Sequence, residues 1–392
     1  MILGLERSTT RIYDRIVLEL AGEIERQGHA VRLIDPTTVT SLRDLLSAYG
    51  SCDWAIITNS TGVLSLPVQS GYLFEAVPTK LAFLHHDAPF NTRELEAIRT
   101  KLRAFQRVRE RSLHFSIEAS DESDLNRLGI PCHPIRHIST IGMPAAEAAP
   151  PVARDIAFIG HVVPPILAPV AFGTELDQAY FESYLARIAR QDHRVKEDFE
   201  KLQGDPPTDG EALFDRVSRK AQYIQYVNSF SLFQRGAILQ GIAAPELHVF
   251  GGDPAWIHGV APSRFLTRDN VRYHPPVFDH GAILDLFRSS AINLNITSLQ
   301  FDSAVINRVL DCAAAGGFLL TDHKEQLFEL TSVAAEISFR TPPELFDKIR
   351  FYLDPAHAGK RQEIARVLAE DIRRSCSPGA TIGSMLDRMS RH

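Results

Sequence analysis

Apolar residues in the first 140 positions form two kinds of run. Short continuous runs of strand length lie at residues 1–5, 30–34, 54–58, 80–84 and 114–117. Apolar residues at helical spacing occupy the stretches between them, at residues 13–27, 41–49, 92–110 and 122–128. Continuously apolar strands that are separated by helices are typical of a parallel sheet covered on both faces. We therefore predict an α/β, Rossmann-like lobe for residues 1–142.

A linker is predicted at residues 143–153. The stretch from Met143 to Pro151 holds two adjacent prolines and two Ala-Ala steps, and it has no further large apolar residue. After it the α/β rhythm restarts, with strands predicted at residues 155–159, 247–250, 271–274, 292–296 and 318–321. Helices are predicted at residues 282–289, 304–314, 343–353 and 361–373. Residues 154–375 thus form a second predicted Rossmann-like lobe.

The second lobe is interrupted by a helical stretch at about residues 165–243. It contains helical patterns at residues 176–190, 194–202 and 211–239. Because these patterns stand between two strands of one expected sheet, we interpret the stretch as a helical insertion. A short terminal helix is predicted at residues 382–389.

Composition narrows the class of protein. The 392 residues suit two domains, and a net charge of −6 argues against a general binder of nucleic acid. The four cysteines form no CxxC pair, which argues against zinc ribbons and disulfide scaffolds and favours a reducing compartment. No apolar run approaches the roughly 18 residues of a membrane span. We expect a cytoplasmic protein that has no nucleic-acid partner.

The most informative chemistry lies between residues 292 and 322. A predicted strand leads into a polar loop and then into a helix expected to begin near Ser303. Free N–H groups at a helix N-terminus suit a diphosphate, Arg308 could reach the same anion, and Asp311 could accept hydrogen bonds from a ribose. Alternatively, the stretch is a plain βαβ unit in which Ser303 caps the helix and Arg308 and Asp311 form a solvated pair.

A second candidate follows the strand at residues 80–84, where His85, His86 and Asp87 come in succession. A carboxylate beside an imidazole can fix its tautomer and raise its pKa, as general-base catalysis requires. We predict catalytic roles for these three residues, with His86 favoured over His85 because it is nearer the loop. Alternatively, one histidine packs within the sheet and Asp87 caps the next turn.

Several motifs in the second lobe resemble, in order, the C-terminal domain of the CgeB-like glycosyltransferases. Residues 293–296 read Asn-Leu-Asn-Ile, residues 308–316 read Arg-Val-Leu-Asp-Cys-Ala-Ala-Ala-Gly, and residues 318–322 read Phe-Leu-Leu-Thr-Asp. Upstream, the strands that end at Gly160, at Gly251 and before Val277 match the first three strands of that domain. This family is a branch of the GT-B fold, related to the large retaining glycosyltransferase group.

The resemblance implies a GT-B glycosyltransferase of two Rossmann-like lobes, with residues 376–392 returning as a helix to the N-terminal lobe. The nucleotide-sugar donor would bind the C-terminal lobe and an unknown acceptor the N-terminal lobe, with transfer in the cleft between them. No metal or other cofactor would be needed, and retention of configuration would be weakly favoured. The implied donor-binding residues are Gly160, Gly251, Gly252, Pro276, Val277, Asn295, Thr297, Ser303, Ala304, Asn307, Arg308 and Asp311.

This chain departs from the family at three positions. Asp311 stands where the family usually has Glu, and Ser303 stands where related retaining enzymes have a second Glu. The usual arginine after the first strand of the C-terminal lobe is absent, and Arg235 at the far end of the insertion could replace it.

Two other classes of function remain open: a non-catalytic binding or scaffold protein that keeps the fold, and an epimerase or hydrolase of nucleotide sugars. The basic helix at residues 93–111 could face an anionic lipid-linked acceptor through peripheral membrane contact, although such a run is usually a solvated face.

Overall fold

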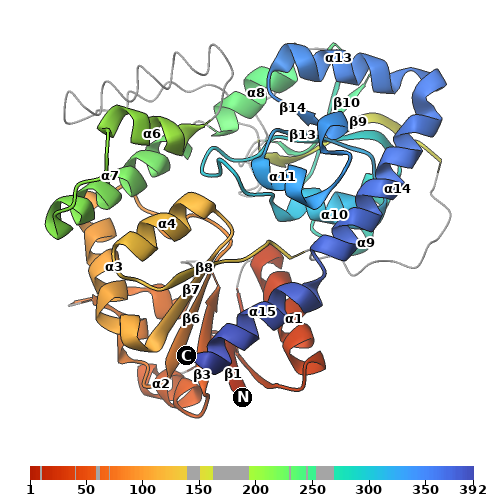
Figure 1. The fold of residues 1–392 in the computed structure, drawn as a ribbon. Helices are drawn as coiled ribbons and strands as arrows, with labels where there is room; N and C mark the ends of the chain where they lie inside the picture. The colour runs from red at the N-terminus through yellow and green to blue at the C-terminus, as the bar shows by residue number, and fades with distance from the viewer. Residues whose placement is uncertain are drawn as a thin grey trace. The chain divides into compact units, whose positions relative to one another are not determined.

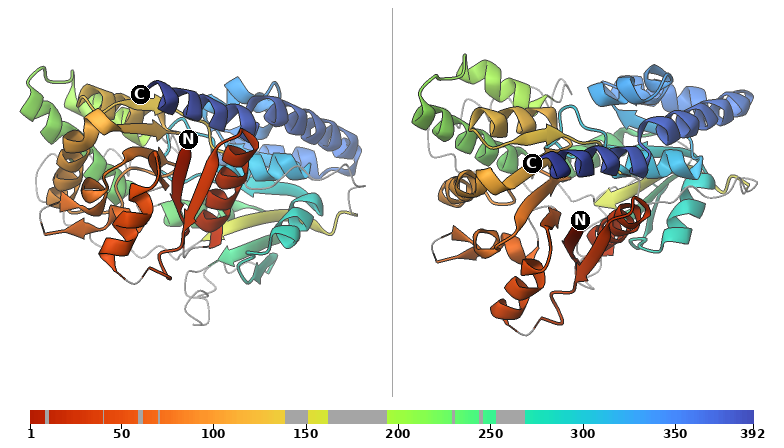
Figure 2. Two further views of the ribbon diagram at one scale, coloured as in Figure 1. Left: turned by 90° about the horizontal axis from the view of Figure 1, so that it is seen from below. Right: turned by 60° about the horizontal axis from the view of Figure 1, so that its bottom comes forward.

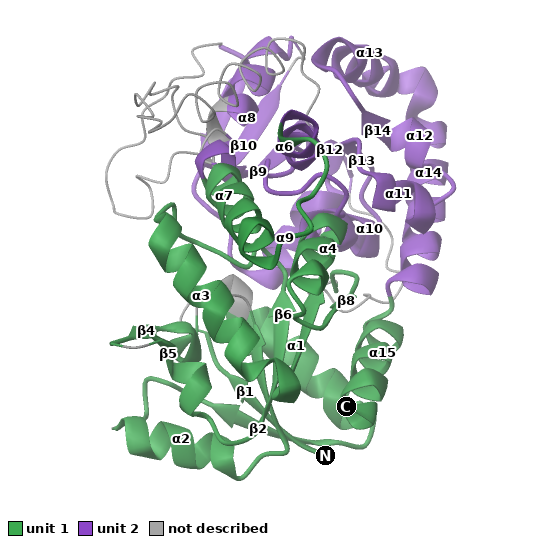
Figure 3. Cartoon of the chain, turned by 60° about the vertical axis from the view of Figure 1, so that its left-hand side comes forward, with its two compact units in different colours: residues 1–140, 203–225, 377–392 green, residues 141–202, 226–376 purple. Residues whose placement is uncertain are grey.

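The chain groups into two compact units, which Figure 3 shows in green and purple. Unit 1 comprises Met1–Thr140, Gln203–Gln225 and Ser377–His392, and unit 2 comprises Ile141–Leu202 and Tyr226–Cys376. The structure is a computed structural model, and it describes residues 1–8, 11–39, 41–58, 62–69, 71–138, 151–161, 194–228, 231–243, 246–252 and 269–392.

Unit 1 is built on a parallel sheet with the strand order β2-β1-β3-β6-β7-β8. Its strands are β1 Ile2–Glu6, β2 Ala30–Ile34, β3 Trp54–Thr58, β6 Lys80–His85, β7 Ser112–Ser116 and β8 Cys132–Pro134. Its helices are α1 Arg11–Arg26, α2 Leu42–Gly50, α3 Leu95–Val108, α4 Ala119–Arg127, most of α7 Gly210–Asn228, and α15 Pro378–Arg391. A small antiparallel pair, β4 Pro67–Val68 and β5 Gly71–Tyr72, precedes β6.

Both faces of this sheet are apolar, as the continuous runs predicted. Successive side chains of a strand point to opposite faces, so Trp54 and Ile56 of β3 pack on one side and Ala55 and Ile57 on the other. The first side is covered by α1 and α15, and the second by α2, α3, α4 and α7. The strands therefore contribute to two hydrophobic cores, one on each side of the sheet.

The C-terminal helix α15 belongs to unit 1. Ser377 caps it by accepting a hydrogen bond from the amide of Ala380, and Pro378 occupies its first turn. Its buried residues, which include Met385 and Met389, join the core beneath α1. Figures 1 and 2 show α15 and α1 side by side, so the last segment of the chain completes the cover of the first strands.

Unit 2 has a parallel sheet with the strand order β11-β10-β9-β12-β13-β14. Its strands are β9 Arg154–His161, β10 Leu247–Gly252, β11 Val271–His274, β12 Ser290–Asn295, β13 Leu319–Asp322 and β14 Ser338–Phe339. Its helices are α6 Val195–Gln203, α8 Ser231–Gly241, α9 His280–Arg288, α10 Asn307–Ala315, α11 Glu325–Leu330, α12 Ala334–Ile337, α13 Pro342–Leu353 and α14 Ala358–Ser375.

The strand order of unit 2 is that of a doubly wound sheet. The chain order reverses between β9 and β12, and open parallel sheets bind ligands at the carboxyl ends of the strands at this switch point. One face packs against α8, α10, α13 and α14, while Ala157, Phe250 and Leu286 pack on the other. The expectation of an α/β protein with two Rossmann-like lobes is confirmed.

Several element boundaries differ from the prediction. The pattern at residues 211–239, predicted as one helix, gives α7 and α8, and Gln203–Gln225 from the predicted insertion groups with unit 1. The helix predicted at residues 304–314 begins only at Asn307. The helix predicted at residues 176–190 and the linker up to residue 150 lie outside the described residues. Within the described ranges, no helix is long and apolar enough to cross a membrane.

Candidate functional site

Glycines bring two strand ends of unit 2 close to each other and to a side chain of the helix α10. A Cβ on Gly251 would lie 3.1 Å from the carbonyl oxygen of Gly160, and Gly251 has a φ of +101°, which favours glycine. A Cβ on Gly160 would lie 3.7 Å from Nη2 of Arg308. The ends of β9 and β10 and the first turn of α10 therefore meet at the switch point. Gly252 ends β10 in register with His161 of β9.

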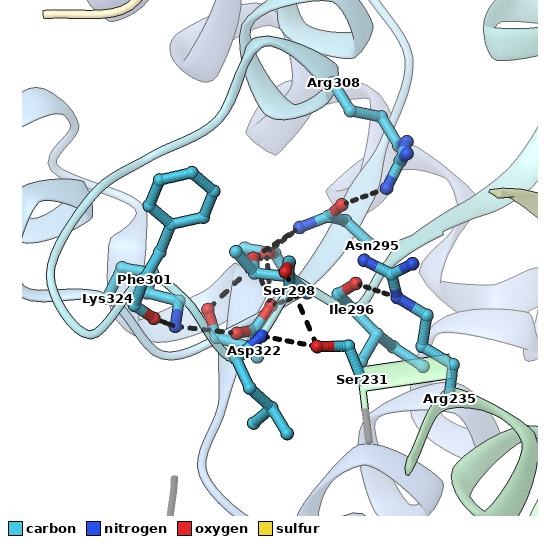
Figure 4. A network of polar contacts seen from close by, with 12 residues as sticks. Ser231, Arg235, Asn295, Ile296, Ser298, Phe301, Arg308, Asp322 and Lys324 are labelled. Carbon is cyan, nitrogen blue, oxygen red and sulfur yellow. Dashed lines mark hydrogen bonds and ion pairs between the residues drawn. The ribbon is translucent and has the colours of Figure 1, made fainter. Parts of the chain in front are cut away.

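The loop that follows β12 is held by hydrogen bonds along its length. The Thr297 amide and hydroxyl both donate to Oδ1 of Asp322, at 2.8 and 2.7 Å, and the Leu299 amide donates to Ser231. The Lys324 ammonium donates to the carbonyl oxygen of Phe301 at 2.6 Å. Figure 4 shows this network around Asp322. The side chain of Thr297, a predicted ligand contact, is thus used within the protein.

The start of α10 corrects the expected role of Ser303. The Ser303 carbonyl and the Val305 amide are both hydrogen-bonded to Gln326, so the backbone there turns toward α11 instead of entering a helix. The N-cap residue of α10 is Ile306, which has no side-chain oxygen to satisfy the first N–H groups. An anion at this helix would therefore meet Asn307 and Arg308, and the buried Ala304 lies before the helix.

Two arginines lie beside the end of β12. Arg308 donates to Oδ1 of Asn295 at 3.0 Å, and Arg235 donates through Nε to the carbonyl oxygen of Ile296 at 2.9 Å. Arg235 is 8% exposed, whereas Arg308 keeps part of its surface accessible. Asn295 is fully buried, and its amide donates to Thr297 and Thr321, which fixes the oxygen that holds Arg308.

The electrostatics of this pair are unusual for arginine. Burial and, to a smaller extent, the charge of Arg308 lower the pKa of Arg235 to about 9, while the charge of Asp322 opposes the shift. Burial also lowers the pKa of Arg308 to about 10, against the opposing charges of Asp311 and Asp322. Among the described residues, neither guanidinium has a carboxylate within ion-pair distance. Two like charges in one poorly solvated place are costly unless an anion compensates them.

The other predicted donor-site residues lie around this place in unit 2. Asp311 is buried one turn along α10 from Arg308, on the same side of the helix. Val277 packs against the small core formed with Phe250, and the partly exposed Pro276 precedes it after β11.

The histidines predicted to be catalytic are enclosed in unit 1. His85 is the last residue of β6, is 2% exposed, and pairs through Nε2 with Nδ1 of His114 at 3.0 Å. His86 is buried with its ring 4.7 Å from that of His137. Their placement resembles the alternative interpretation, in which histidine packs within the sheet. Asp87 is the least buried of the three.

The expected rise in the histidine pKa is wrong. Burial, with the nearby charge of Lys101, lowers the pKa of His85 to about 3, and burial lowers that of His86 well below its usual value. Among the residues that the structure describes, no carboxylate contributes to either shift. Both imidazoles are therefore neutral at physiological pH and resist protonation, which is unfavourable for a general base.

The structure also shows functional groups that the sequence patterns did not single out. Lys101, in the basic run of α3, is 4% exposed, donates to the carbonyl oxygen of Pro89 at 3.0 Å, and has its pKa lowered to about 7 by burial. It thereby holds the segment that follows Asp87. In unit 2, Arg194, His323, Lys324 and Arg340 border one cavity. Neither the burial of Lys101 nor the cavity could be predicted from a sequence motif, because both arise from contacts between segments that are distant in the sequence.

No metal site is apparent in the described part of the chain, since no group of three His, Cys, Asp or Glu side chains is placed to hold an ion.

Comparisons with known proteins agree with this geometry. Residues 235–387 match the model of a family described as glycosyl transferase-like. The chain has the fold of a GT-B glycosyltransferase. Sucrose-phosphate synthase from Thermosynechococcus elongatus superposes with a TM-score of 0.57 at 11% identity, covering 100% of this chain and 98% of that one. T4 phage β-glucosyltransferase superposes with a TM-score of 0.54 at 10% identity, covering 99% of each chain. An α-glucosyltransferase in complex with UDP gives 0.56 at 10% identity, also over 99% of each chain.

No curated protein matches the sequence significantly. The prediction of a glycosyltransferase is confirmed at the level of this domain and fold, and the CgeB-like branch is not distinguished from others. One T4 phage enzyme structure contains UDP and Mn²⁺, and a similar structure is that of a DNA modifying enzyme. The expectations of metal independence and of no nucleic-acid partner therefore stay predictions.

Proposed function

We propose that this chain transfers a sugar from a nucleotide-sugar donor to an acceptor, and that unit 2 binds the donor at the carboxyl ends of β9, β10 and β12. The observation that carries the proposal is the pair of guanidinium groups beside the end of β12, with Arg235 at the Ile296 carbonyl and Arg308 between Asn295 and Gly160. They are cations without a carboxylate partner in the described structure, at the switch point of a doubly wound sheet. A diphosphate is the anion whose charge and size suit two such groups.

In this proposal the diphosphate lies against the first turn of α10 and the two arginines. The helix N-terminus and both cations would stabilise the charge that develops as the diphosphate leaves. Glycines at positions 160 and 251 would let the backbone approach the phosphates, and Asp311 would accept hydrogen bonds from the ribose. The sugar C1 loses its bond to the diphosphate oxygen and gains a bond to the acceptor oxygen, whose proton passes to a base.

We further propose that unit 1 contributes to the acceptor side of the reaction. We favour Asp87 over His85 and His86 as the base because its side chain is more accessible to solvent. Burial lowers the pKa of both histidines, so that they accept a proton poorly. The CgeB-like branch and retention of configuration belong to the same proposal.

A donor screen tests the proposal. Uridine, guanosine, cytidine and thymidine diphosphate sugars are compared by thermal shift, and a ligand at 100 times its dissociation constant adds about 2.7 kcal/mol of stability. The stabilising donor is then incubated with candidate acceptors, and glycosylated product is sought by mass spectrometry. Release of free sugar and nucleotide without an acceptor would support the hydrolase alternative. Binding without turnover would support the scaffold alternative, and no binding by any donor would refute the proposal.

A further inference from the structure

One buried cation of unit 1 has no carboxylate partner. Lys101, on α3, is 4% exposed, and among the residues that the structure describes no carboxylate lies within ion-pair distance of its ammonium. Lysine is almost never fully buried unless it is paired. Lys220 of α7, which is 3% exposed, follows this rule because it pairs with Asp124 at 2.8 Å. The burial of Lys101 therefore needs another explanation.

The contacts of Lys101 compensate for only part of its lost hydration. Its ammonium donates a hydrogen bond to the Pro89 carbonyl oxygen at 3.0 Å, and it lies 5.8 Å and 5.7 Å from the ring centres of Tyr72 and Phe105. Those two distances are close to the outer limit of about 6 Å for a cation–π contact. A buried charge without an opposite charge is costly. We therefore expect methionine, an apolar side chain of similar length, to stabilise unit 1 more than lysine does at this position.

The hydrogen bond from this ammonium reaches the segment that follows β6. Pro89 is buried, whereas Asp87, two residues before it, is partly exposed. At the other end of the segment, the His85 ring pairs with that of His114 at 3.0 Å, and the His85 carbonyl oxygen accepts a hydrogen bond from the amide of Ile117 at 3.3 Å. The backbone that carries Asp87 is thus held on both sides by hydrogen bonds to buried residues.

We propose that Lys101 is a positioning residue for the acceptor side of the reaction: its ammonium fixes the Pro89 carbonyl, so that the Asp87 carboxylate is presented to the acceptor hydroxyl. A displacement of about 1 Å can lower the rate of a reaction by about a hundredfold. A lysine that lowers the stability of the fold can therefore still raise the rate of transfer. The role of Asp87 as the base belongs to the proposed function, and this inference rests on it.

The first test compares the stability of Lys101→Met with that of a matched control, Lys220→Met. Unfolding of unit 1 is followed through the fluorescence of Trp54 in a Trp256→Phe background. We expect Lys101→Met to raise the melting temperature by about 2–4 °C or more, because an uncompensated buried charge is removed. Lys220→Met should lower it, because Asp124 then loses its buried partner. A lower melting temperature of Lys101→Met would make Lys101 an ordinary part of the core and overturn the proposal.

The second test measures sugar transfer by the same two variants, with the donor and acceptor on which the wild type acts. Lys101→Met should lower turnover by about tenfold to a hundredfold. Its affinity for UDP, GDP, CDP and TDP should equal that of the wild type, because unit 2 binds the nucleotide in the proposed function. Lys220→Met should keep the turnover of the wild type at temperatures at which it is folded. A variant that is more stable and yet slower is the result that a merely structural lysine would not give, and full turnover of Lys101→Met would overturn the proposal.

A double-mutant cycle tests whether Lys101 acts through Asp87. Lys101→Met should cause little further loss of turnover in an Asp87→Asn background, because the group that it positions is then already absent. Losses that multiply would show that the two residues act independently and would overturn the proposal. Full turnover of Lys101→Met beside a slow Asp87→Asn rejects this inference alone. A wild type that neither binds a nucleotide nor transfers a sugar rejects the proposed function, and this role of Lys101 with it.

Discussion

The buried histidines of unit 1 predict that it loses stability in acid. His85 and His137 have their pKa lowered by burial from 6.5 to about 3 and about 4, and the pKa values of His86 and His114 are lowered in the same direction. A group whose pKa is lower in the folded state than in the unfolded chain binds fewer protons in the folded state. Stability is therefore fully present above about pH 6.5 and falls as the pH drops toward 4.

The size of the loss follows from the pKa shifts of His85 and His137. Each contributes about 1.36 kcal/mol per pH unit once the unfolded imidazole is protonated and the folded one is not. Between pH 7 and pH 5, His85 and His137 together remove about 4 kcal/mol of unfolding free energy. Since whole domains are stable by about 5–15 kcal/mol, this loss is a large fraction of the total.

Urea unfolding at several pH values measures the effect. Trp54 is buried in unit 1 and is one of two tryptophans, so a Trp256→Phe background makes its fluorescence report on unit 1. His85→Phe should reduce the slope against pH by about 1.36 kcal/mol per unit, because one titrating group is gone. Phe115→Leu, a buried change without a titratable group, should lower stability equally at each pH. Equal stability of the wild type at pH 7 and pH 5 would refute the reasoning.

Three further predictions concern the proposed sites. Asp87→Asn should lower turnover by about a hundredfold or more while nucleotide affinity stays unchanged, as steady-state kinetics and calorimetry would measure; full turnover would place the base elsewhere. Gly251→Ala should abolish or strongly weaken nucleotide binding, because its Cβ would meet the Gly160 carbonyl and its positive φ would be strained. The control Gly359→Ala, which has nothing within 4 Å, should bind as the wild type does. Asp311→Asn should weaken nucleotide binding, and a 2′-deoxy nucleotide should then lose little further affinity; additive losses would contradict a ribose contact.

Much of the fold could be predicted because it depends on local pattern. The run at residues 54–58 coincides with β3, which is buried along nearly all of its length, since a parallel strand covered on both faces needs a continuous apolar segment. Short elements such as β14 and the β4–β5 pair were missed, because two residues carry no period. The start of α10 was placed too early because contacts with Gln326, which is distant in sequence, decide where the helix begins.

The candidate site could be predicted only in part. Arg308 and Asp311 lie on the same side of α10 because they are three positions apart, a spacing that can be read from the sequence. The partners of the histidines do not follow from sequence spacing: His114 and His137 reach His85 and His86 from a neighbouring strand and from a later loop, and burial reverses the expected pKa shift. The cavity that Arg194 and Arg340 border in unit 2 could not be predicted, because these two residues are 146 positions apart in the sequence.

The central claim is that Arg308 and Arg235 bind the diphosphate of a nucleotide-sugar donor. Calorimetric titration of UDP into the wild type, Arg308→Ala and the exposed control Arg366→Gln tests it most directly. A hydrogen bond to a charged group is worth about 1.5–3 kcal/mol, so Arg308→Ala should bind UDP about 10- to 150-fold more weakly, with the control unchanged. Equal affinity of Arg308→Ala and the wild type for the nucleotide they bind, or no binding of UDP, GDP, CDP or TDP to the wild type, would contradict it.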